Sequence, residues 1–349
     1  MGSLRRVSLA RAIQGSNSIE GYEAGLDDAV DVAAGEEPLD ANEETSLALR
    51  GYRDAMTYVL QMAEDDGGSP YSAQLLKSLH FMMTSYSLNN RPGRWRAGSI
   101  YVRNDEKGEV VYEGPDIDQV SDLVEELVAS LIEGPQGNSS SIINAGMAHL
   151  NLVMIHPFRD GNGRMARCLQ SLVLARGGVL SPMFMSIEEY LGRNTQSYYN
   201  ILAEVGGGSW QPERDARPWI RFILTAHLRQ ARTMLRRVNE SERTWLELER
   251  LVSMRGLPER TIMALFDATI GLRVRNATYR SYFEYTPDEI TETTASRDLR
   301  QLVDADLLAP RGESRGRYYV ARPELVKIRK MVRSMRDARD DSDPFASTE

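Results

Sequence analysis

One short segment, residues 156–167, constrains the fold of this 349-residue chain more than any other. It reads HPFRDGNGRMAR, and the stretch before it, residues 142–155, places apolar side chains near helical spacing. Because proline restricts the residue that precedes it, we predict that a buried helix stops before Pro157 and delivers His156 to a loop. Two glycines, Gly161 and Gly163, can adopt positive φ and carry no Cβ. The segment therefore predicts two helices joined by a short polar turn.

The polar side chains of this turn suit the binding of a nucleotide polyphosphate. His156, with an ordinary pKa of about 6.5, can be neutral near physiological pH and take a proton from an attacking hydroxyl. Backbone N–H groups of the glycine turn can face an anion at the start of the next helix. Arg164 and Arg167 are neighbours on one helical face, where they can hold phosphate oxygens, and Asp160 is a hard oxygen ligand suited to Mg²⁺. The alternative is a polar helix cap with a satisfied core histidine.

With every fixed position filled, the segment resembles the motif of the Fic family, His-Pro-Phe-x-Asp-Gly-Asn-Gly-Arg-x-x-Arg. Fic proteins are mostly helical enzymes that typically move AMP from ATP onto a hydroxyl of a protein side chain. The resemblance implies that His156 is the general base and that Asp160 binds Mg²⁺. It also implies that the nucleotide is bound by the rest of the motif, namely Gly161, Asn162, Gly163, Arg164 and Arg167.

A second segment, residues 16–21, reads SNSIEG and is similar to the inhibitory motif of this family, Ser/Thr-x-x-x-Glu-Gly/Asn. By this resemblance the carboxylate of Glu20 reaches Arg167 in a charge-assisted bidentate pair and occupies the donors wanted by the γ-phosphate. The protein would then be made in an inhibited state. The alternative is that Glu20 is a solvated helix residue.

Residues 96–104 and 109–112 alternate around a turn-rich tip and predict a β-hairpin. In Fic enzymes the hairpin here is the flap, in this chain residues 98–113, which aligns the backbone of the target by strand addition. The residues that we expect to dock the target are Ile100, Tyr101, Val102 and Arg103. The alternative is an ordinary surface hairpin.

Farther along, Tyr198 and Tyr199 resemble a Tyr-Tyr pair that lies near the adenine in the family. Aromatic residues at helical spacing are also common in protein cores, so core packing of both tyrosines is the alternative.

Four regions follow from the patterning along the chain. Residues 1–95 form an N-terminal helical region with the inhibitory motif, and residues 96–238 form the Fic catalytic core, whose helices we expect to end near Arg236. Within these regions, helical spacing predicts helices over 42–65, 71–88 and 117–132.

The third region, residues 239–336, resembles a winged helix-turn-helix domain. It combines a short helix near 286–290, a capped helix with Leu299, Leu302 and Val303 facing inward, and a glycine-turned hairpin. Residues 337–349 are polar and are expected to be disordered. The predicted fold class is mainly α: a Fic-type helical core with a β-hairpin flap, plus a C-terminal winged helix-turn-helix.

Composition narrows the class of protein. Hydrophobic residues make up 42% of the chain, enough for sizeable cores, and the single cysteine, Cys168, excludes an internal disulfide framework. No apolar run suits export or a membrane span, so we expect a cytoplasmic protein without membrane contact. The net charge of −8 argues against binding of nucleic acid over the whole protein surface. Because arginines and acidic residues are mixed in the winged-helix segment, we favour a partner-binding or dimer-stabilising module there over DNA binding.

The resulting prediction is an autoinhibited, Mg²⁺-dependent protein adenylyltransferase that moves AMP from ATP to Ser, Thr or Tyr hydroxyls of a target protein and forms a homo-oligomer such as a homodimer. Self-modification is left open. One alternative is a nucleotide-sensing transcriptional regulator. The other is an enzyme that uses the same site for phosphate transfer or for removal of AMP from modified protein.

Overall fold

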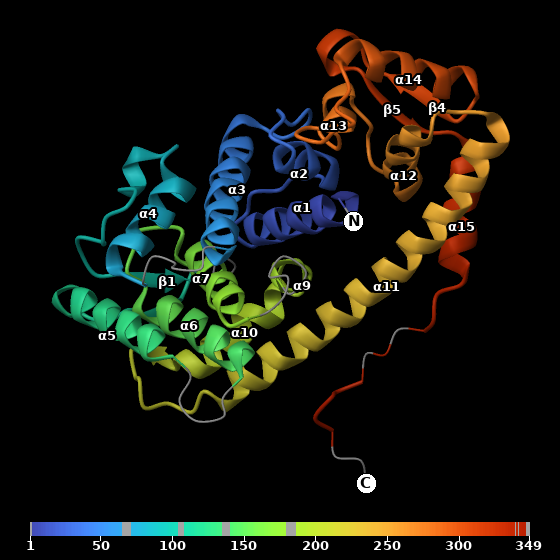
Figure 1. The fold of residues 1–349 in the computed structure, drawn as a ribbon. Helices are drawn as coiled ribbons and strands as arrows, with labels where there is room; N and C mark the ends of the chain where they lie inside the picture. The colour runs from blue at the N-terminus through green and yellow to red at the C-terminus, as the bar shows by residue number, and fades with distance from the viewer. Residues whose placement is uncertain are drawn as a thin grey trace. The chain divides into compact units, whose positions relative to one another are not determined.

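The computed structural model describes residues 2–64, 71–103, 108–134, 140–178, 186–338, 340 and 342–346. Over these residues the protein is mainly helical, as predicted (Figure 1). The chain forms two compact units. Unit 1 comprises Met1–Ala10, Gly25–Ala41 and Arg232–Ser342, and unit 2 comprises Arg11–Ala24, Asn42–Ala231 and Asp343–Glu349.

Unit 2 is built around two helices, α6 (Ser141–Ile155) and α7 (Asn162–Arg176), which pack against each other extensively. The helices predicted over 42–65, 71–88 and 117–132 are confirmed as α3, α4 and α5. The bounds of the surrounding elements are α3 Glu43–Glu64, α4 Ala73–Thr84, η1 Leu88–Asn90, η2 Ile117–Gln119, α5 Val120–Glu133, α9 Glu188–Arg193 and α10 Thr195–Gly206.

A buried core in unit 2 holds α6, α9, α10 and the first part of α11 together. Its members are buried and apolar: Ile19, Leu150, Ile187, Tyr190, Leu191, Tyr198, Val205, Trp219, Ile223 and Ala226. Removing these side chains from water is the main favourable contribution to this packing.

The loop between α6 and α7 begins as the sequence predicts. The N–H of His156 donates to the carbonyl of Leu152 at 3.0 Å and closes the last turn of α6. His156 itself is left-handed, with φ 50° and ψ 57°, and Pro157 follows. The left-handed residue turns the chain sharply, and Gly161, with φ 75°, makes the second turn that starts α7.

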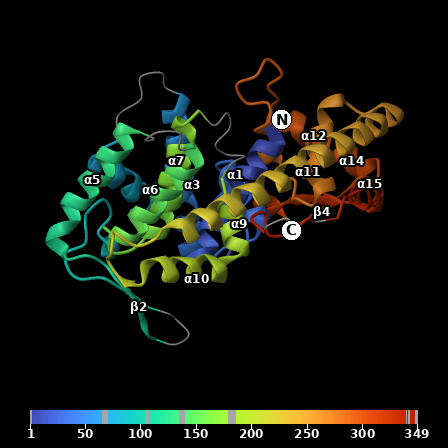
Figure 2. The same cartoon turned by 90° about the horizontal axis from the view of Figure 1, so that it is seen from below.

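A small sheet of unit 2 carries the predicted hairpin. Strand β1 (Tyr101–Arg103) pairs antiparallel with β2 (Val110–Glu113), with a register shift between Val102 and Arg103. The tip at 104–107 lies outside the described residues. Figure 2 shows β2 at the margin of the unit.

The sheet contains a third strand that the sequence does not predict. Strand β3 (Gly208–Ser209) runs parallel to β2, with Tyr112 opposite Gly208. Glycine has low β propensity and two residues carry no alternating pattern, so no local signal marks this strand.

Unit 1 contains its own core, formed by the second part of α11 and the elements after it. Those elements are η3 Glu259–Thr261, α12 Ile262–Ile270, α13 Asn276–Arg280, α14 Glu292–Asp304, β4 Leu308–Arg311, η4 Ser314–Gly316, β5 Tyr318–Ala321 and α15 Pro323–Ser334. Strands β4 and β5 form an antiparallel hairpin. In α14, Leu299 and Leu302 are buried and Val303 is half-buried, as the sequence predicts. Unit 1 also holds α2 (Leu26–Ala33) and the start of α1 (Gly2–Ile19).

The prediction of a short helix near residues 286–290 is wrong. The structure forms turns there, and a short helix, α13, lies earlier in the sequence. Tyr285 is left-handed, with φ 59°, and Pro287 has no N–H to donate. The left-handed residue prevents a helix from running through position 285 into this stretch. The order of helix, helix and hairpin in unit 1 is still that of the predicted winged-helix module, which stays a prediction.

The predicted end of the core helices near Arg236 is also wrong. Helix α11 runs without interruption over Arg217–Arg255. From Trp219 to Arg255 the sequence has neither glycine nor proline, and the first strong stop is Gly256, with φ 63°. The boundary predicted between residues 238 and 239 therefore lies inside one continuous helix.

Among the described residues, no helix combines the length and the apolar character that crossing a membrane requires.

Candidate active site

The imidazole of His156 lies at the rim of the loop and is half-buried. Its Nδ1 is 3.1 Å from the carbonyl oxygen of Val153, which can only accept a hydrogen bond, so Nδ1 carries the proton. The lone pair of Nε2 is then the basic position. Burial lowers the pKa of His156 below its ordinary value, and the hydrogen bond to Val153 only partly opposes this effect. The ring is therefore neutral at physiological pH, as a general base must be.

Arg96, which the sequence does not mark, fixes the backbone around His156. Its Nε donates to the carbonyl of His156 at 3.0 Å, and its own backbone N–H donates to the carbonyl of Pro157 at 2.8 Å. The same guanidinium donates to the carbonyls of Gly98, at 2.7 Å, and Pro115. Gly98 and Pro115 flank the hairpin in sequence. Arg96 therefore joins both ends of the hairpin to His156.

His80 of α4 is a second residue that sequence reasoning misses. It is fully buried and stacks on Phe158 with ring centroids 3.8 Å apart. The N–H of Gly93 donates to its Nδ1 at 2.9 Å, and its Nε2 is 3.0 Å from the carbonyl of Asp160. Burial lowers the pKa of His80 to about 4, so it stays neutral and holds the loop in place.

Asn162 closes the loop from the other side. Its Oδ1 accepts from the N–H of Phe158 at 2.9 Å, and its Nδ2 donates to the carbonyl of Phe158 at 3.0 Å. The side chain is thus engaged by the loop's own backbone. Its contribution in this structure is to the shape of the loop, and the groups left to face an anion are the first N–H groups of α7, which have no partner within the helix.

Both motif arginines are buried beside that helix start. Arg164 donates to the hydroxyl of Tyr86 at 3.1 Å and lies 3.5 Å from a carboxylate oxygen of Asp160. Arg167 donates through Nε to the hydroxyl of Ser16 at 2.8 Å and through Nη2 to the carbonyl of Ser16 at 2.9 Å. Its Nη1 is buried and has no hydrogen-bond partner among the residues that the structure describes. An unpaired buried donor costs free energy and marks a place where an acceptor would be bound.

Glu20 reaches this arginine from the end of α1. Its Oε1 accepts from Nη2 of Arg167 at 2.6 Å, so the ion pair expected from the sequence is present. The prediction of bidentate geometry is wrong, because Nε donates to Ser16 and the hydrogen bond to Glu20 runs through Nη2. Burial opposes ionisation of Glu20, but the charges of Arg167 and Arg164 outweigh it and lower the pKa of the carboxyl. Glu20 is therefore anionic at physiological pH.

The glycine at position 163 explains how this carboxylate comes so close to α7. A Cβ on Gly163 would lie 2.4 Å from Oε1 of Glu20 and 3.0 Å from Nη1 of Arg167. The carboxylate thus sits directly over the first turn of α7, where helix geometry favours a negative charge.

Asp160 is half-buried at the same loop. Asn90 donates to its Oδ2 at 2.9 Å, the oxygen that also faces Arg164. Among the described residues, no group of three or more His, Cys, Asp or Glu side chains could hold a metal ion by itself. A cation bound here would therefore need oxygens from the substrate, which is the usual situation for Mg²⁺ on nucleotides.

The two tyrosines of α10 lie in different surroundings. Tyr198 is buried in the core, and its hydroxyl is 2.9 Å from Nε2 of His149, so its packing matches the core alternative. Tyr199 is 45% exposed, and its hydroxyl donates to the carbonyl of Ile19 at 2.8 Å. It therefore holds the residue before Glu20, a contact that the sequence did not indicate.

The hairpin presents one open side to solvent. In the sheet order β1-β2-β3, strand β1 is at an edge, and Tyr101 and Val110 are each 49% exposed. Of the predicted docking residues, Tyr101 and Arg103 are exposed, whereas Ile100 and Val102 are half-buried. An edge strand offers unpaired N–H and carbonyl groups to a further strand.

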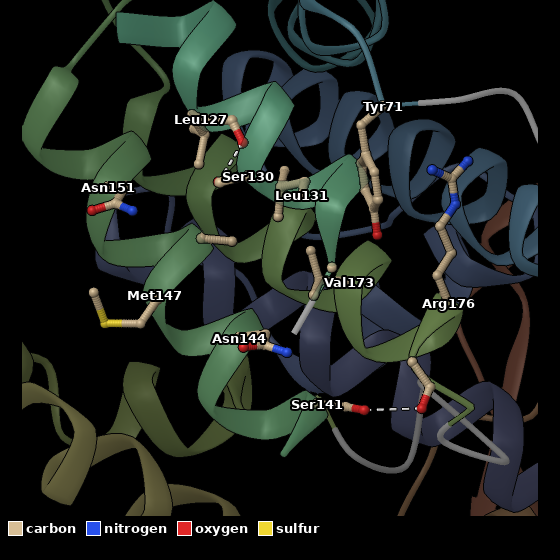
Figure 3. A pocket seen from close by; sticks show the side chains of 13 residues that line it. Tyr71, Leu127, Ser130, Leu131, Ser141, Asn144, Met147, Asn151, Val173 and Arg176 are labelled. Carbon is tan, nitrogen blue, oxygen red and sulfur yellow. Dashed lines mark hydrogen bonds between the residues drawn. The ribbon is translucent and has the colours of Figure 1, made fainter. Parts of the chain in front are cut away.

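A cavity of about 460 Å³ lies elsewhere in unit 2, between α5, α6 and α7 (Figure 3). Leu127 and Leu131 of α5, Met147 of α6 and Val173 of α7 give it an apolar lining, and Asn144 and Asn151 add polar groups. Arg176, over the ring of Tyr71 at 4.4 Å, lies at the opposite end of α7 from the glycine turn. None of the lining residues belongs to the 156–167 motif.

Residues 70–174 match the model of the Fic/DOC family, a stretch that contains the hairpin, α6 and the whole motif. The chain is thus similar to the Fic/DOC family over these residues. Among solved structures, a Fic family protein from Desulfovibrio desulfuricans G20 is similar over 93% of this chain and 89% of that one, with a TM-score of 0.57 and 21% identity. A Fic domain containing signaling protein from Bacteroides thetaiotaomicron is similar over 64% of this chain and 85% of that one, with a TM-score of 0.54 and 21% identity. At these identities the likeness is one of fold.

Curated relatives share shorter stretches. A protein adenylyltransferase Fic of Nematostella vectensis is 38% identical over 79 residues, which is 23% of this chain and 16% of that protein. A protein adenylyltransferase fic-1 of Caenorhabditis elegans is 32% identical over 135 residues, which is 38% of this chain and 22% of that protein. The aligned part thus spans about a fifth of the length of these relatives.

Proposed function

We propose that this protein is a protein adenylyltransferase that transfers AMP from ATP to a hydroxyl of a target protein. The observation that carries the proposal is the loop 156–161. A neutral histidine whose Nε2 carries no proton lies at its rim, and the start of α7 with two buried arginines lies behind it. The relatives named protein adenylyltransferase support the same reaction.

In this mechanism Nε2 of His156 takes the proton of a Ser, Thr or Tyr hydroxyl as its oxygen attacks the α-phosphorus of ATP. The bond from the α-phosphorus to the bridging oxygen breaks, and pyrophosphate leaves. The N–H groups at the start of α7 and the charge of Arg164 stabilise the negative charge that develops on the phosphates. Most of the rate enhancement would come from positioning and from charge.

Asp160 is the residue that would hold Mg²⁺, together with phosphate oxygens of ATP. The fit is adequate, because the carboxylate is accessible and lies beside the phosphate-binding end of α7. When bound, the cation neutralises charge on the leaving pyrophosphate.

We further propose that the protein is autoinhibited in the state that the structure shows. Glu20 occupies Arg167 and the space over Gly163, which an ATP γ-phosphate would need. ATP could then bind only in a pose that does not align its α-phosphorus with the base. The docking of a target on strand β1 by backbone hydrogen bonds belongs to the same proposal.

The reaction is tested by incubating the Glu20→Gly variant with Mg²⁺ and either α-labelled or γ-labelled ATP, with a protein extract as acceptor. We expect protein to retain the α label and not the γ label, at a rate about tenfold or more above that of the unaltered chain. Such a factor corresponds to about 1.4 kcal/mol of competing interaction. Retention of only the γ label would instead establish phosphate transfer.

His156→Ala in the Glu20→Gly background is the matched control. Loss of a general base lowers rates by roughly 10²- to 10⁴-fold. ATP affinity, measured by equilibrium binding, should stay within about twofold, since Nε2 of His156 is not assigned to the nucleotide. A fully active His156→Ala protein would disprove the proposed role of the base.

A further inference from the structure

The segment that carries Glu20 lies in the sequence between two stretches that belong to the other unit. Glu20 lies in Arg11–Ala24, which belongs to unit 2, but the residues before it, up to Ala10, and after it, Gly25–Ala41, belong to unit 1. The chain thus leaves unit 1, crosses the candidate active site and returns to unit 1.

The first attachment is a buried ion pair at the start of α1. Arg6 lies 2.9 Å from a carboxylate oxygen of Asp267, and Ser3 donates to the other oxygen at 2.8 Å. The guanidinium of Arg6 also stacks over Tyr282 at 3.9 Å and donates to the carbonyl of Thr278 at 3.0 Å. Since Asp267 is 3% exposed, these contacts fix the position of α1 in unit 1.

The second attachment is a charged cluster around Arg273. Its guanidinium lies 2.6 Å from Asp28 and 2.7 Å from Asp40, and its backbone N–H donates to Asp27 at 2.8 Å. Arg275 lies 3.2 Å from Asp31 in the same cluster. Four acidic residues on or after α2 are thus bound by two arginines of unit 1.

Little slack separates these attachments from Glu20. Helix α1 is continuous over Gly2–Ile19, so the backbone between Arg6 and Ser16 is rigid. After Glu20 only residues 21–24 precede unit 1 again. The 2.6 Å ion pair between Glu20 and Arg167 therefore depends on where α1 ends.

We propose that unit 1 controls the inhibition: the two attachments hold Glu20 against Arg167, and a partner or ligand that displaces either attachment releases the site. This inference rests on the proposed function, because it concerns the regulation of that same site. It assigns to the C-terminal part of the chain the role of a sensor that acts through residues 1–41.

The test compares AMP transfer by full-length variants that weaken each attachment. Arg6→Gln removes the first and Arg273→Gln the second. Arg255→Gln is the matched control, because Arg255 pairs with Glu324 within unit 1, at 2.9 Å, and both side chains are exposed. We expect a severalfold increase in α-label transfer for each attachment variant and no change for the control.

The same substitutions in the Glu20→Gly background separate this inference from the proposed function. If the attachments act through Glu20, these substitutions do not increase the rate of AMP transfer further in the Glu20→Gly background. An unchanged rate for both attachment variants, with Glu20→Gly active, would overturn the control by unit 1. A Glu20→Gly protein that transfers no AMP would instead defeat the proposed reaction.

Amide hydrogen exchange of residues 11–24 gives a readout that does not depend on activity. We expect faster exchange in this segment alone when an attachment is weakened. If the Arg273→Gln variant shows fast amide exchange over the whole chain, the substitution has unfolded the protein, and the milder Asp40→Asn variant is measured in its place. Asp40 is 78% exposed, and its substitution removes only one partner of Arg273. Normal protection of residues 11–24 and an unchanged rate in that variant would count against the proposal.

Discussion

Arg96 illustrates how one side chain can position several backbone segments at the candidate active site. Its bonds to the carbonyls of His156, Gly98 and Pro115 leave the loop and the hairpin little freedom to move independently. Left-handed backbone at a residue with a Cβ costs about 1 kcal/mol or more, and such conformations persist when surrounding bonds over-determine them. We infer that Arg96 maintains the conformation of His156.

Arg96→Gln should therefore impair target use more than ATP binding. In the Glu20→Gly background we expect a higher KM for the target and a lower kcat, with the ATP dissociation constant nearly unchanged. Steady-state kinetics and equilibrium binding measure these separately. Arg94→Gln, the same change at an exposed residue two positions earlier, is the control. An unchanged KM for the target would show that Arg96 does not align the hairpin with the base.

The pH dependence of transfer should follow the lowered pKa of His156. Burial disfavours the charged imidazolium, so the base stays deprotonated until the pH falls well below its ordinary pKa of about 6.5. The acidic limb of the kcat/KM profile should accordingly lie below that value, with a flat region around neutral pH. A limb above it would mean that another group titrates.

At the scale of single residues, the sequence predicts the motif and the partner of Glu20 but not Arg96 or His80. The motif is contiguous, so its chemistry is visible in the letters. Arg96 acts on carbonyl groups, which every residue has and no sequence pattern marks. His80 stands alone in an apolar helix, and only its type sets it apart. Side chains that contact backbone groups are thus the part of the site that can be identified only from a structure.

Among the elements, long helices with clear spacing are predicted well, and the failures come from weak or absent punctuation. The two-residue strand β3 depends on its neighbour β2 and not on its own residues. Helix α11 continues past residue 240 because nothing in its sequence stops it. The end of a helix is set by glycine, proline or a cap more than by a change of composition.

The continuity of α11 can be tested with Val238→Pro. Proline in a helix interior costs about 3 kcal/mol because it removes a hydrogen bond and clashes with the preceding turn. We expect the free energy of unfolding, from urea titration followed by circular dichroism, to fall by about that amount. Val238→Ala at the same half-exposed position should change it by about 0.5 kcal/mol or less. Equal stabilities of the two variants would indicate a helix already broken there.

At the scale of the whole molecule, the net charge and the charges on α14 bear on the alternative that the protein binds DNA. The net charge is −8, and α14 presents Arg297 and Arg300 beside Asp304 on its exposed face. Asp298 does not belong to that face, because it is buried and bound by Arg260 at 2.7 and 2.8 Å. The exposed surface of this helix is thus mixed in charge.

We expect no binding of a short DNA duplex at physiological salt in gel-shift experiments, with or without ATP. Real binding to phosphates would be strong at low salt and weaken steeply as salt rises, because counterions are released. Binding that weakens steeply as salt rises but is still measurable at physiological salt would favour the transcriptional regulator.

Gly163 has a consequence for how such a protein can change over evolution. The open space above its Cα is needed by the carboxylate of Glu20, and a phosphate approaching the start of α7 would need it too. Any replacement that adds a side chain there crowds both occupants at once. Under the proposed function, lineages that lose the inhibition by Glu20 but keep AMP transfer must therefore alter Glu20 or its supports. Position 163 should remain glycine in active and in inhibited descendants alike.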